Sequence, residues 1–401
     1  MVHPADEHTG ARIADYRKLR QLTQVGLAQR AFVSRGTIAK IEAGLTPPSP
    51  AMVAAVARVL EVEVAVLNGQ PYLAEMQQDR LDRMIAPLSD ALDAYDLGPD
   101  PDITPRPIER LTAEVDTLCA ATCATEYRRV GAELPGLLAE LTTAFDAAPP
   151  VRETQAIAAA LSWCYWMAYE FAYRLGYHHL ASIALERMGW TAEQAQDPLL
   201  LAIRLTKRSS MLLRRGDNQM ALRVVDRAHQ LVAQHDGADD TPGLAVTGSL
   251  HLAAAIAAAQ ARNEDVVQSN MELARRAAER IGRDVPQVYW SGFGATSVAH
   301  FDVANCVELG KLGEAAQKAR HVRFPAEHPK TRVGRYHIEM ARAYAQMGKA
   351  GAAERALHLA REAAPQQARY HPLMRSTIGV LVRRQRRTPT GLSSLAAWVG
   401  M

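Results

Sequence analysis

Aromatic residues and cysteines are both scarce in this chain of 401 residues, in which 6% of residues are aromatic and four are cysteines. No CxxC pair is present, and the four cysteines are Cys119, Cys123, Cys164 and Cys306. Cysteines scattered in this way argue against a disulfide framework and against a cysteine-rich metal site. We therefore expect core thiols in a reducing cytoplasm, and no bound metal.

Long apolar runs, strong charge and enzyme motifs are also missing. Runs such as 252–261 are short and alanine-rich, and the N-terminus lacks the basic and apolar regions of a signal peptide, so we expect no membrane partner. The net charge of +3 is compatible with a nucleic-acid partner but too small to demonstrate one. Because the chain has no P-loop, strand-linked GxGxxG, HExxH or GxSxG motif, we predict that it is not an enzyme and holds no cofactor.

The composition that remains favours helices. The chain is 48% hydrophobic and rich in Ala, Leu and Arg, without the alternation that is typical of strands. This pattern predicts an all-α fold. Apolar residues at helical spacing predict helices at about 72–95, 108–130, 134–147, 150–175 and 177–188, with a proline-rich connector after the first.

Two short helical patterns separated by a tight turn occupy Thr23 to Gly44. Thr23 and Ser34 each offer a hydroxyl that caps a helix start, and Gly44 offers the left-handed residue that ends the second helix. If Ile38 and Ile41 are buried, the opposite face of that helix points outward. This face consists of Arg35, Gly36, Thr37 and Lys40. The spacing is that of a DNA-reading helix-turn-helix.

Residues 10–69 resemble the Cro/repressor-type (XRE) helix-turn-helix domain through the stretches RIADYRKLRQLTQVGLA, VSRGTIAKIEAGLTPPSPAMVAAVARVLEV and VLNG. The resemblance implies a five-helix, lambda-repressor-like DNA-binding domain over residues 1–70. Arg17 and Glu42 match a pair that forms a buried ion pair in the family. Phe32 stands where the family's turn commonly has glycine. The DNA contacts implied by the resemblance are Gln24, Ser34, Arg35, Thr37 and Lys40.

The C-terminal part contains helical repeats. The stretch AYAQMGKAGAAERALHLAREAAP places Gly348, Ala353 and Ala360 where small side chains let antiparallel helices approach closely, and it resembles the tetratricopeptide (TPR) signature. Looser copies turn near Gly216, Asn263 and Gly310. We predict a TPR-like array over residues 108–401 that serves effector binding and dimerisation, and a bridging helix with a proline-rich connector over residues 71–107.

The order of an XRE domain, a bridging helix and a TPR-like array resembles the XRE–TPR regulators of actinobacteria. The resemblance implies a bacterial transcription regulator that binds a palindromic operator as a homodimer. A peptide or a small molecule bound in the repeat domain would control it. The alternative is an interaction scaffold, in which the repeats dock a partner protein and the helix-turn-helix tethers it to DNA.

Seven of the few aromatic residues lie in the segment SWCYWMAYEFAYRLGY. Their helical spacing makes one broad stripe, which forms either ordinary inter-helix core or the aromatic wall of a ligand groove. Tyr289 and Trp290 could supply a facing wall, and Arg204, Lys207 and Asn305 could hold a peptide backbone or carboxylate. The candidate stripe residues are Trp163, Trp166, Tyr169, Tyr173 and Tyr177.

Overall fold

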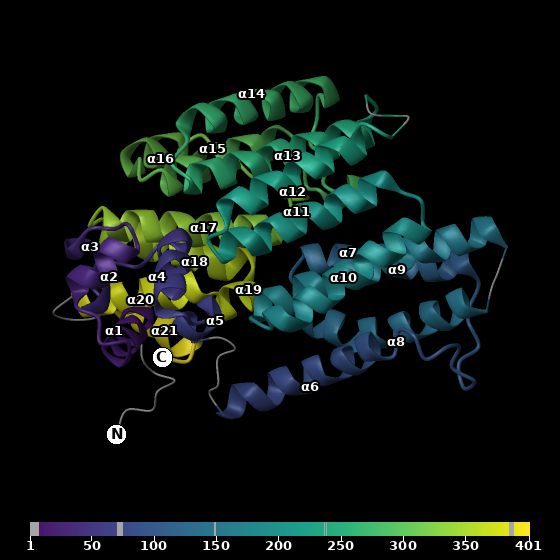
Figure 1. Cartoon of the computed structure of the whole chain (residues 1–401), viewed down its shortest axis with the longest axis horizontal. Helices are drawn as coiled ribbons and strands as arrows, with labels where there is room; N and C mark the ends of the chain where they lie inside the picture. The colour runs from purple at the N-terminus through teal and green to yellow at the C-terminus, as the bar shows by residue number, and fades with distance from the viewer. Residues whose placement is uncertain (1–7, 70–74, 148–149, 236, 238, 385–388) are drawn as a thin grey trace.

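The structure is a computed structural model of the whole chain, shown in Figure 1. It describes all residues except 1–7, 70–74, 148–149, 236, 238 and 385–388, and for residues 75–83 it describes the backbone alone. The expected all-α fold is confirmed, because the described residues form helices and no strand. A single isolated antiparallel bridge joins Val285 and Phe293 within this described part.

The first five helices form a small N-terminal domain. They are α1 (Thr9–Leu19), α2 (Gln24–Arg30), α3 (Arg35–Glu42), α4 (Pro50–Leu60) and α5 (Val64–Asn68). The side-chain oxygens of Thr23, Ser34 and Ser49 accept a hydrogen bond from the backbone N–H three residues later, as N-caps do. Gly44 ends α3 with φ +67°. Ile13, Leu27, Ile38 and Ile41 lie in one buried core with the apolar face of α4.

The chain then enters the repeat region through α6 (Glu75–Asp93), α7 (Ile108–Cys123) and α8 (Tyr127–Asp146). Residues 72–74 of the expected bridging helix lie outside the described residues. The expected break near residue 131 is wrong, since Gly131 and Pro135 lie inside α8 and α7 ends at a left-handed Thr125, φ +64°. Helix α8 continues past Gly131 and Pro135 because a continuous apolar face is buried on either side of them. The buried residues of this face are Tyr127, Val130, Leu134, Leu137, Leu138 and Leu141.

Five further helical hairpins follow. They are α9 (Val151–Leu175) with α10 (His178–Gln194), α11 (Pro198–Arg214) with α12 (Asn218–Val232), α13 (Thr241–Gln260) with α14 (Glu264–Ile281), α15 (Ala295–Glu308) with α16 (Leu312–Lys318), and α17 (Lys330–Gln346) with α18 (Ala350–Ala363). Gly216, Gly310 and Gly348 adopt positive φ at three of the turns, as the repeat pattern predicts. Ala221, Ala315 and Ala353 are fully buried where the paired helices approach.

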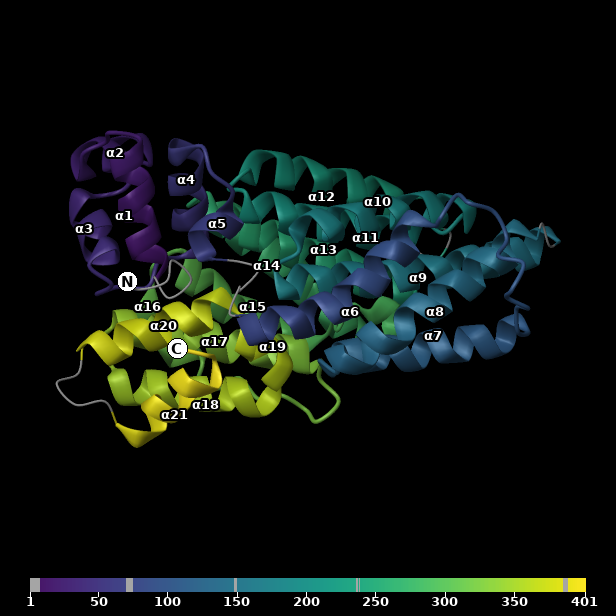
Figure 2. The ribbon, with the colours of Figure 1, turned by 90° about the horizontal axis from the view of Figure 1, so that it is seen from below.

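The chain ends in α19 (Pro365–Tyr370), α20 (Pro372–Arg384) and α21 (Thr390–Trp398). Helix α19 packs against α9, and the backbone N–H of Arg128 donates to Oε1 of Gln366 at 3.0 Å, so the two ends of the array meet. In Figures 1 and 2, the N-terminal domain lies beside the last helices of the chain. The array therefore curves back on itself and encloses an interior.

One helix in the described residues, Thr241–Gln260, is long and apolar enough to cross a membrane. However, 78% of its apolar window is buried inside the protein. It packs against α12, α14 and α15, and against α11. Its apolar character is accounted for by its position as a core helix.

Three side chains form hydrogen bonds that dock the N-terminal domain on the repeats. Arg383 Nε of α20 donates to the carbonyl oxygen of Gly44 at 3.1 Å, and Gln346 Nε2 of α17 donates to that of Pro47 at 3.1 Å. In the other direction, Arg58 Nη2 of α4 donates to the carbonyl oxygen of Gly216 at 2.6 Å. The loop after α3 is therefore held by the repeat domain.

Candidate DNA-binding surface and central cavity

Helix α3 presents a polar face to solvent. Arg35, Gly36 and Lys40 are exposed and Thr37 is partly exposed, while Ile38 and Ile41 are buried beneath them. Ser34 Oγ accepts from the backbone N–H of Thr37 at 3.0 Å, and the two hydroxyls lie 2.8 Å apart. Ser34 and Thr37 thus hold the first turn of α3 while staying at its surface, where a backbone phosphate can approach.

Arg17 and Glu42 form a two-pronged ion pair. Arg17 Nε lies 2.6 Å from Glu42 Oε1 and Nη2 lies 2.9 Å from Oε2, and the side chains are 12% and 7% exposed. Burial raises the pKa of Glu42, but hydrogen bonds from Arg17 and Gln24 and the charge of Arg17 lower it further, so the net pKa is depressed. The pair joins α1 to α3 and so fixes the tilt of α3.

Gln24 lies at the first turn of α2, but its side chain is engaged inside the domain. Its Nε2 donates to Glu42 Oε2 at 2.9 Å, which links α2 to the same ion pair. Its amide oxygen and the second hydrogen of Nε2 are left for a DNA contact. Phe32, in the turn between α2 and α3, has φ +54° and is 96% exposed. The turn thus keeps the left-handed geometry that suits glycine although it carries an aromatic side chain.

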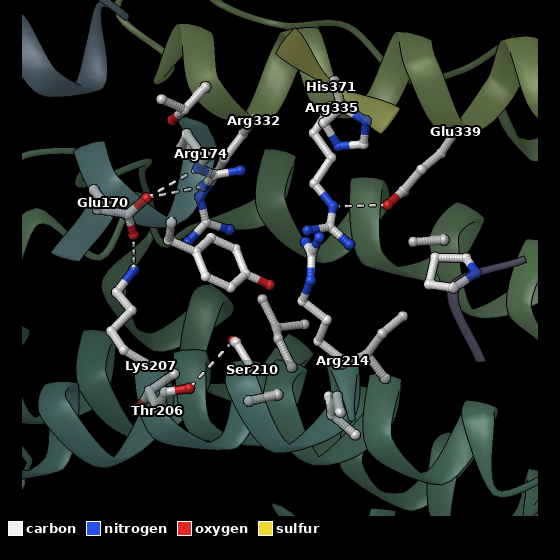
Figure 3. Close-up of a pocket in the computed structure, with 18 of the residues that line it drawn as sticks. Glu170, Arg174, Thr206, Lys207, Ser210, Arg214, Arg332, Arg335, Glu339 and His371 are labelled. Carbon is white, nitrogen blue, oxygen red and sulfur yellow. Dashed lines mark hydrogen bonds and ion pairs between the residues drawn. The ribbon is translucent and has the colours of Figure 1, made fainter. Parts of the chain in front are cut away.

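A cavity of about 270 Å³ lies inside the repeat array. Its wall consists mainly of the first helices of the hairpins, which are α7, α9, α11, α13, α15 and α17. Helix α20, and helices α4 and α5 of the N-terminal domain, complete the wall. We call it the central cavity. Figure 3 shows its charged side chains.

Each of the two carboxylates in the central cavity forms an ion pair with basic side chains. Glu170 lies 3.0 Å from Arg174 Nη2 and 2.8 Å from Lys207 Nζ, and Arg335 Nε donates to Glu339 at 2.7 Å. Burial raises the pKa of Glu170, but the charges and hydrogen bonds of Lys207 and Arg174 lower it to about 2. Glu170 is therefore ionised at neutral pH and neutralises part of the positive charge around it.

The N-terminal part of the chain matches a known protein family. Residues 13–67 match the family model described as Helix-turn-helix. These residues form a helix-turn-helix domain. The expected XRE resemblance is thereby confirmed.

Two individual proteins are similar to the chain. The immunity repressor protein of Bacillus phage phi105 is 41% identical over 69 residues, which are 17% of this chain and 48% of the repressor. The chain thus spans about half the length of that curated relative. A solved structure, Bacillus thuringiensis PlcR in complex with the peptide PapR7 and DNA, has 12% identity and a TM-score of 0.31, with 89% of this chain and 94% of that chain covered.

Of the aromatic and polar residues that were predicted to contact an effector, some line the central cavity and others do not. Trp166, Tyr173 and Trp290 line the central cavity, as does Lys207. The predicted residues that do not line it are Trp163, Tyr169, Tyr177, Arg204, Tyr289 and Asn305. The helix-turn-helix domain contributes Pro50 and Val53 to the wall, which the sequence did not lead us to expect.

The six residues outside the cavity have other surroundings. Tyr169 is buried against Tyr173, with ring centroids 5.4 Å apart, and Tyr177 is the partly buried N-cap residue of α10. Trp163 packs between Trp166 and Tyr289, and the Tyr289 hydroxyl donates to Asp197 at 2.8 Å. Arg204 pairs with Glu186 at 2.6 Å. Asn305 is buried, and its amide has no hydrogen-bond partner in the described part of the chain.

The residues that sequence reasoning missed are the arginines of the cavity. Arg174, Arg214, Arg332 and Arg335 come from three helices that are distant in the chain. One local signal existed, because Glu170 and Arg174 stand four residues apart within the aromatic stripe. A charged pair in so apolar a segment indicates a buried polar site.

Proposed function

We propose that this chain is a DNA-binding transcription regulator. The observation that carries the proposal is the helix-turn-helix domain with an exposed polar α3, whose buried side is fixed by Ile38, Ile41 and the ion pair of Arg17 with Glu42. The curated relative that is similar over this domain is named a repressor. In this proposal α3 enters the major groove, where Arg35 and Lys40 reach bases and phosphates.

The regulator acts as a homodimer on a palindromic operator. A single recognition helix buries too little surface for tight, specific binding, whereas a second copy adds a half-site about 34 Å further along the groove. The test is footprinting of the full-length protein on sites selected from random DNA. Two protected half-sites about one helical turn apart support the proposal. Protection that stays unspecific over all sequences, or a monomer on the bound site, contradicts it.

An effector held in the repeat domain controls this binding. The central cavity supports that part of the proposal, because it gathers aromatic and charged side chains from several helices around one hollow. In this proposal, Trp166, Tyr173 and Trp290 contact the effector. Native mass spectrometry of freshly purified protein separates this mode of control from a docked partner protein. An extra mass of a few hundred daltons supports an effector, whereas co-purification of a protein supports the scaffold.

A further inference from the structure

The central cavity carries an excess of positive charge. Five cationic side chains and two carboxylates line it, which leaves three positive charges in excess. The cations are Arg174, Lys207, Arg214, Arg332 and Arg335. Figure 3 shows the guanidinium groups of Arg335 and Arg214 pointing toward one another across the interior. Like charges gathered in a space of low dielectric repel each other, and an anion placed among them relieves that repulsion.

Arg332 contributes a buried positive charge to the cavity wall. Glu170 binds Arg174 and Lys207, and Glu339 binds Arg335, but no carboxylate of the described residues forms an ion pair with Arg332. Its partners are neutral: the carbonyl oxygen of Ser291, and the ring of Phe301 at 5.7 Å. Burial lowers the pKa of Arg332 to about 10, so it stays protonated at neutral pH in an environment that disfavours its charge.

Uncharged polar atoms of the wall also lack partners. Ser249 Oγ, Gln260 Oε1 and His300 Nδ1 are buried and have no hydrogen-bond partner among the described residues, and His300 is 4% exposed. Burial and nearby arginines hold the pKa values of His300 and His371 well below their ordinary value, so these rings stay neutral. Unpaired buried polar groups cost stability, and a polar ligand can satisfy them.

The remaining wall is aromatic and the space is small. Trp166, Tyr173, Trp290 and Phe301 line the cavity beside the arginines. Its volume of about 270 Å³ lies just below the range of roughly 300–1,000 Å³ that is typical of small-molecule pockets. A molecule with one or two rings fits a volume of this size.

We propose that the central cavity binds a small organic anion, a carboxylate or phosphate attached to an aromatic ring, with the anionic group on Arg332 and the ring against Trp166 and Tyr173. This deepens the proposed function, on which it rests for its regulatory meaning, by naming the class of effector. Because Pro50 and Val53 of the helix-turn-helix domain also line the cavity, the space that holds the anion borders both parts of the chain.

The test uses 2-naphthoate as the probe and its neutral isostere 2-naphthamide as the matched comparison, titrated into the full-length protein by calorimetry without DNA. The two molecules differ in charge but hardly in shape. We expect naphthoate to bind at least about tenfold more tightly than the amide, because the amide lacks the negative charge and the second acceptor oxygen that a carboxylate offers to arginine. Equal affinities, or no binding of either probe, would overturn the proposal.

Three variants locate the bound anion. Arg332→Gln should remove the preference for naphthoate, whereas Arg276→Gln on the exposed surface of α14 should leave it unchanged. Glu170→Gln, which deletes a negative charge beside the site, should strengthen naphthoate binding several-fold. Stronger binding cannot come from misfolding, so this variant keeps the proposal testable if Arg332→Gln is unstable. Weaker or unchanged binding in Glu170→Gln would contradict the anion site.

Operator binding of the same preparations is measured separately by footprinting. A protein that binds its operator but does not discriminate naphthoate from naphthamide refutes the anion site and leaves the DNA-binding proposal standing. A protein that discriminates the probes but protects no DNA site refutes the proposed function and supports the anion site.

Discussion

The backbone of Phe32 is strained, because the turn between α2 and α3 holds this residue in an unfavourable conformation. Its φ of +54° lies in the left-handed region, which disfavours side chains with a Cβ, and its ring is 96% exposed, so burial returns little. Phe32→Gly should therefore raise the free energy of unfolding by ~1 kcal/mol, as measured by urea denaturation. Phe32→Ala is the control, because it removes the ring but keeps the strain. If alanine stabilises as much as glycine, the backbone is not the cause.

Glu42 is the residue on which the orientation of α3 depends. Glu42→Ala leaves Arg17 uncompensated and 12% exposed, and removes the acceptor of Gln24 as well. We expect a loss of ~3–5 kcal/mol in the free energy of unfolding. Glu61→Ala is the matched control, because Glu61 also pairs with an arginine, Arg20 at 3.1 Å, but is 74% exposed. That pair should contribute less than about 1 kcal/mol. Similar losses in the two variants would show that burial of the pair is not what matters.

Glu170 makes stability depend on pH in a defined window. Its folded-state pKa of about 2 lies below the ordinary value of 4.5, so the unfolded chain takes up the proton first as the pH falls. The stability that the ionised group contributes is present above 4.5 and is lost as the pH falls through the folded pKa near 2. Urea midpoints followed from pH ~5 to pH ~3 should fall more steeply for the wild-type chain than for Glu170→Gln. Parallel pH profiles would count against the depressed pKa.

At the scale of elements, the proposed function gives α3 two kinds of DNA contact that mutation can separate. Arg35, at the first turn, is placed for a base edge, and its replacement by alanine should weaken operator binding by ~1–3 kcal/mol and relax base preference at one position. Lys40, one turn later, is placed for a phosphate, so Lys40→Ala should weaken binding to all sequences and reduce the salt slope by about one. Binding titrations at several salt concentrations, on the selected site and on random DNA, distinguish the two results. Identical behaviour of the two variants would refute this assignment of roles.

The elements that sequence reasoning predicted well are those with local signals. Thr23 and Ser34 cap the helices expected of them, and Gly44 adopts the expected left-handed conformation, because each of these features depends on a few adjacent residues. The predicted boundary between α7 and α8 was wrong because it, too, was based on local signals alone. Gly131 and Pro135 are local helix breakers, but the buried face from Tyr127 to Leu141 outweighs them through contacts with α6 and α9.

The aromatic stripe on α9 shows how far helical spacing can specify a site. Spacing places Trp166, Tyr169 and Tyr173 on one face, yet Tyr169 lies against α11 and only its two neighbours reach the cavity. Which side of a buried stripe faces open space depends on how α11 and α17 pack around it. The arginines of α11 and α17 enter the same site from positions more than a hundred residues apart in the chain, so periodicity within one helix could not bring them together.

At the scale of the whole molecule, the docking of the helix-turn-helix domain on the repeats could not be foreseen. The contacts of Arg383, Gln346 and Arg58 all end on backbone carbonyl oxygens, which carry no residue signature. Two of them hold the loop that directly follows α3, and α4 beyond that loop lines the central cavity. The cavity, the docking contacts and α3 are thus physically continuous, and this continuity is the route by which we propose that an effector acts on α3.

Arg383 offers the sharpest test of that route. Arg383→Ala removes the bond to Gly44 and should loosen the end of α3, where the Gly44 and Leu45 amides donate to Ile41 and Lys40 at 2.9 and 2.7 Å. We expect hydrogen exchange of these two amides to accelerate by about tenfold, while the amides of the domain core keep their protection.

The neighbouring Arg384 is the control for this experiment, since its Nη1 donates to the carbonyl oxygen of Ala345 at 2.8 Å, within the repeat domain. Arg384→Ala therefore removes an arginine of the same helix without touching the loop after α3, and exchange of the Gly44 and Leu45 amides should remain as in the wild-type chain. If Arg383→Ala also leaves these amides unchanged, the repeats do not hold the loop in solution. In that case a signal from the cavity would have to reach α3 through α4 alone.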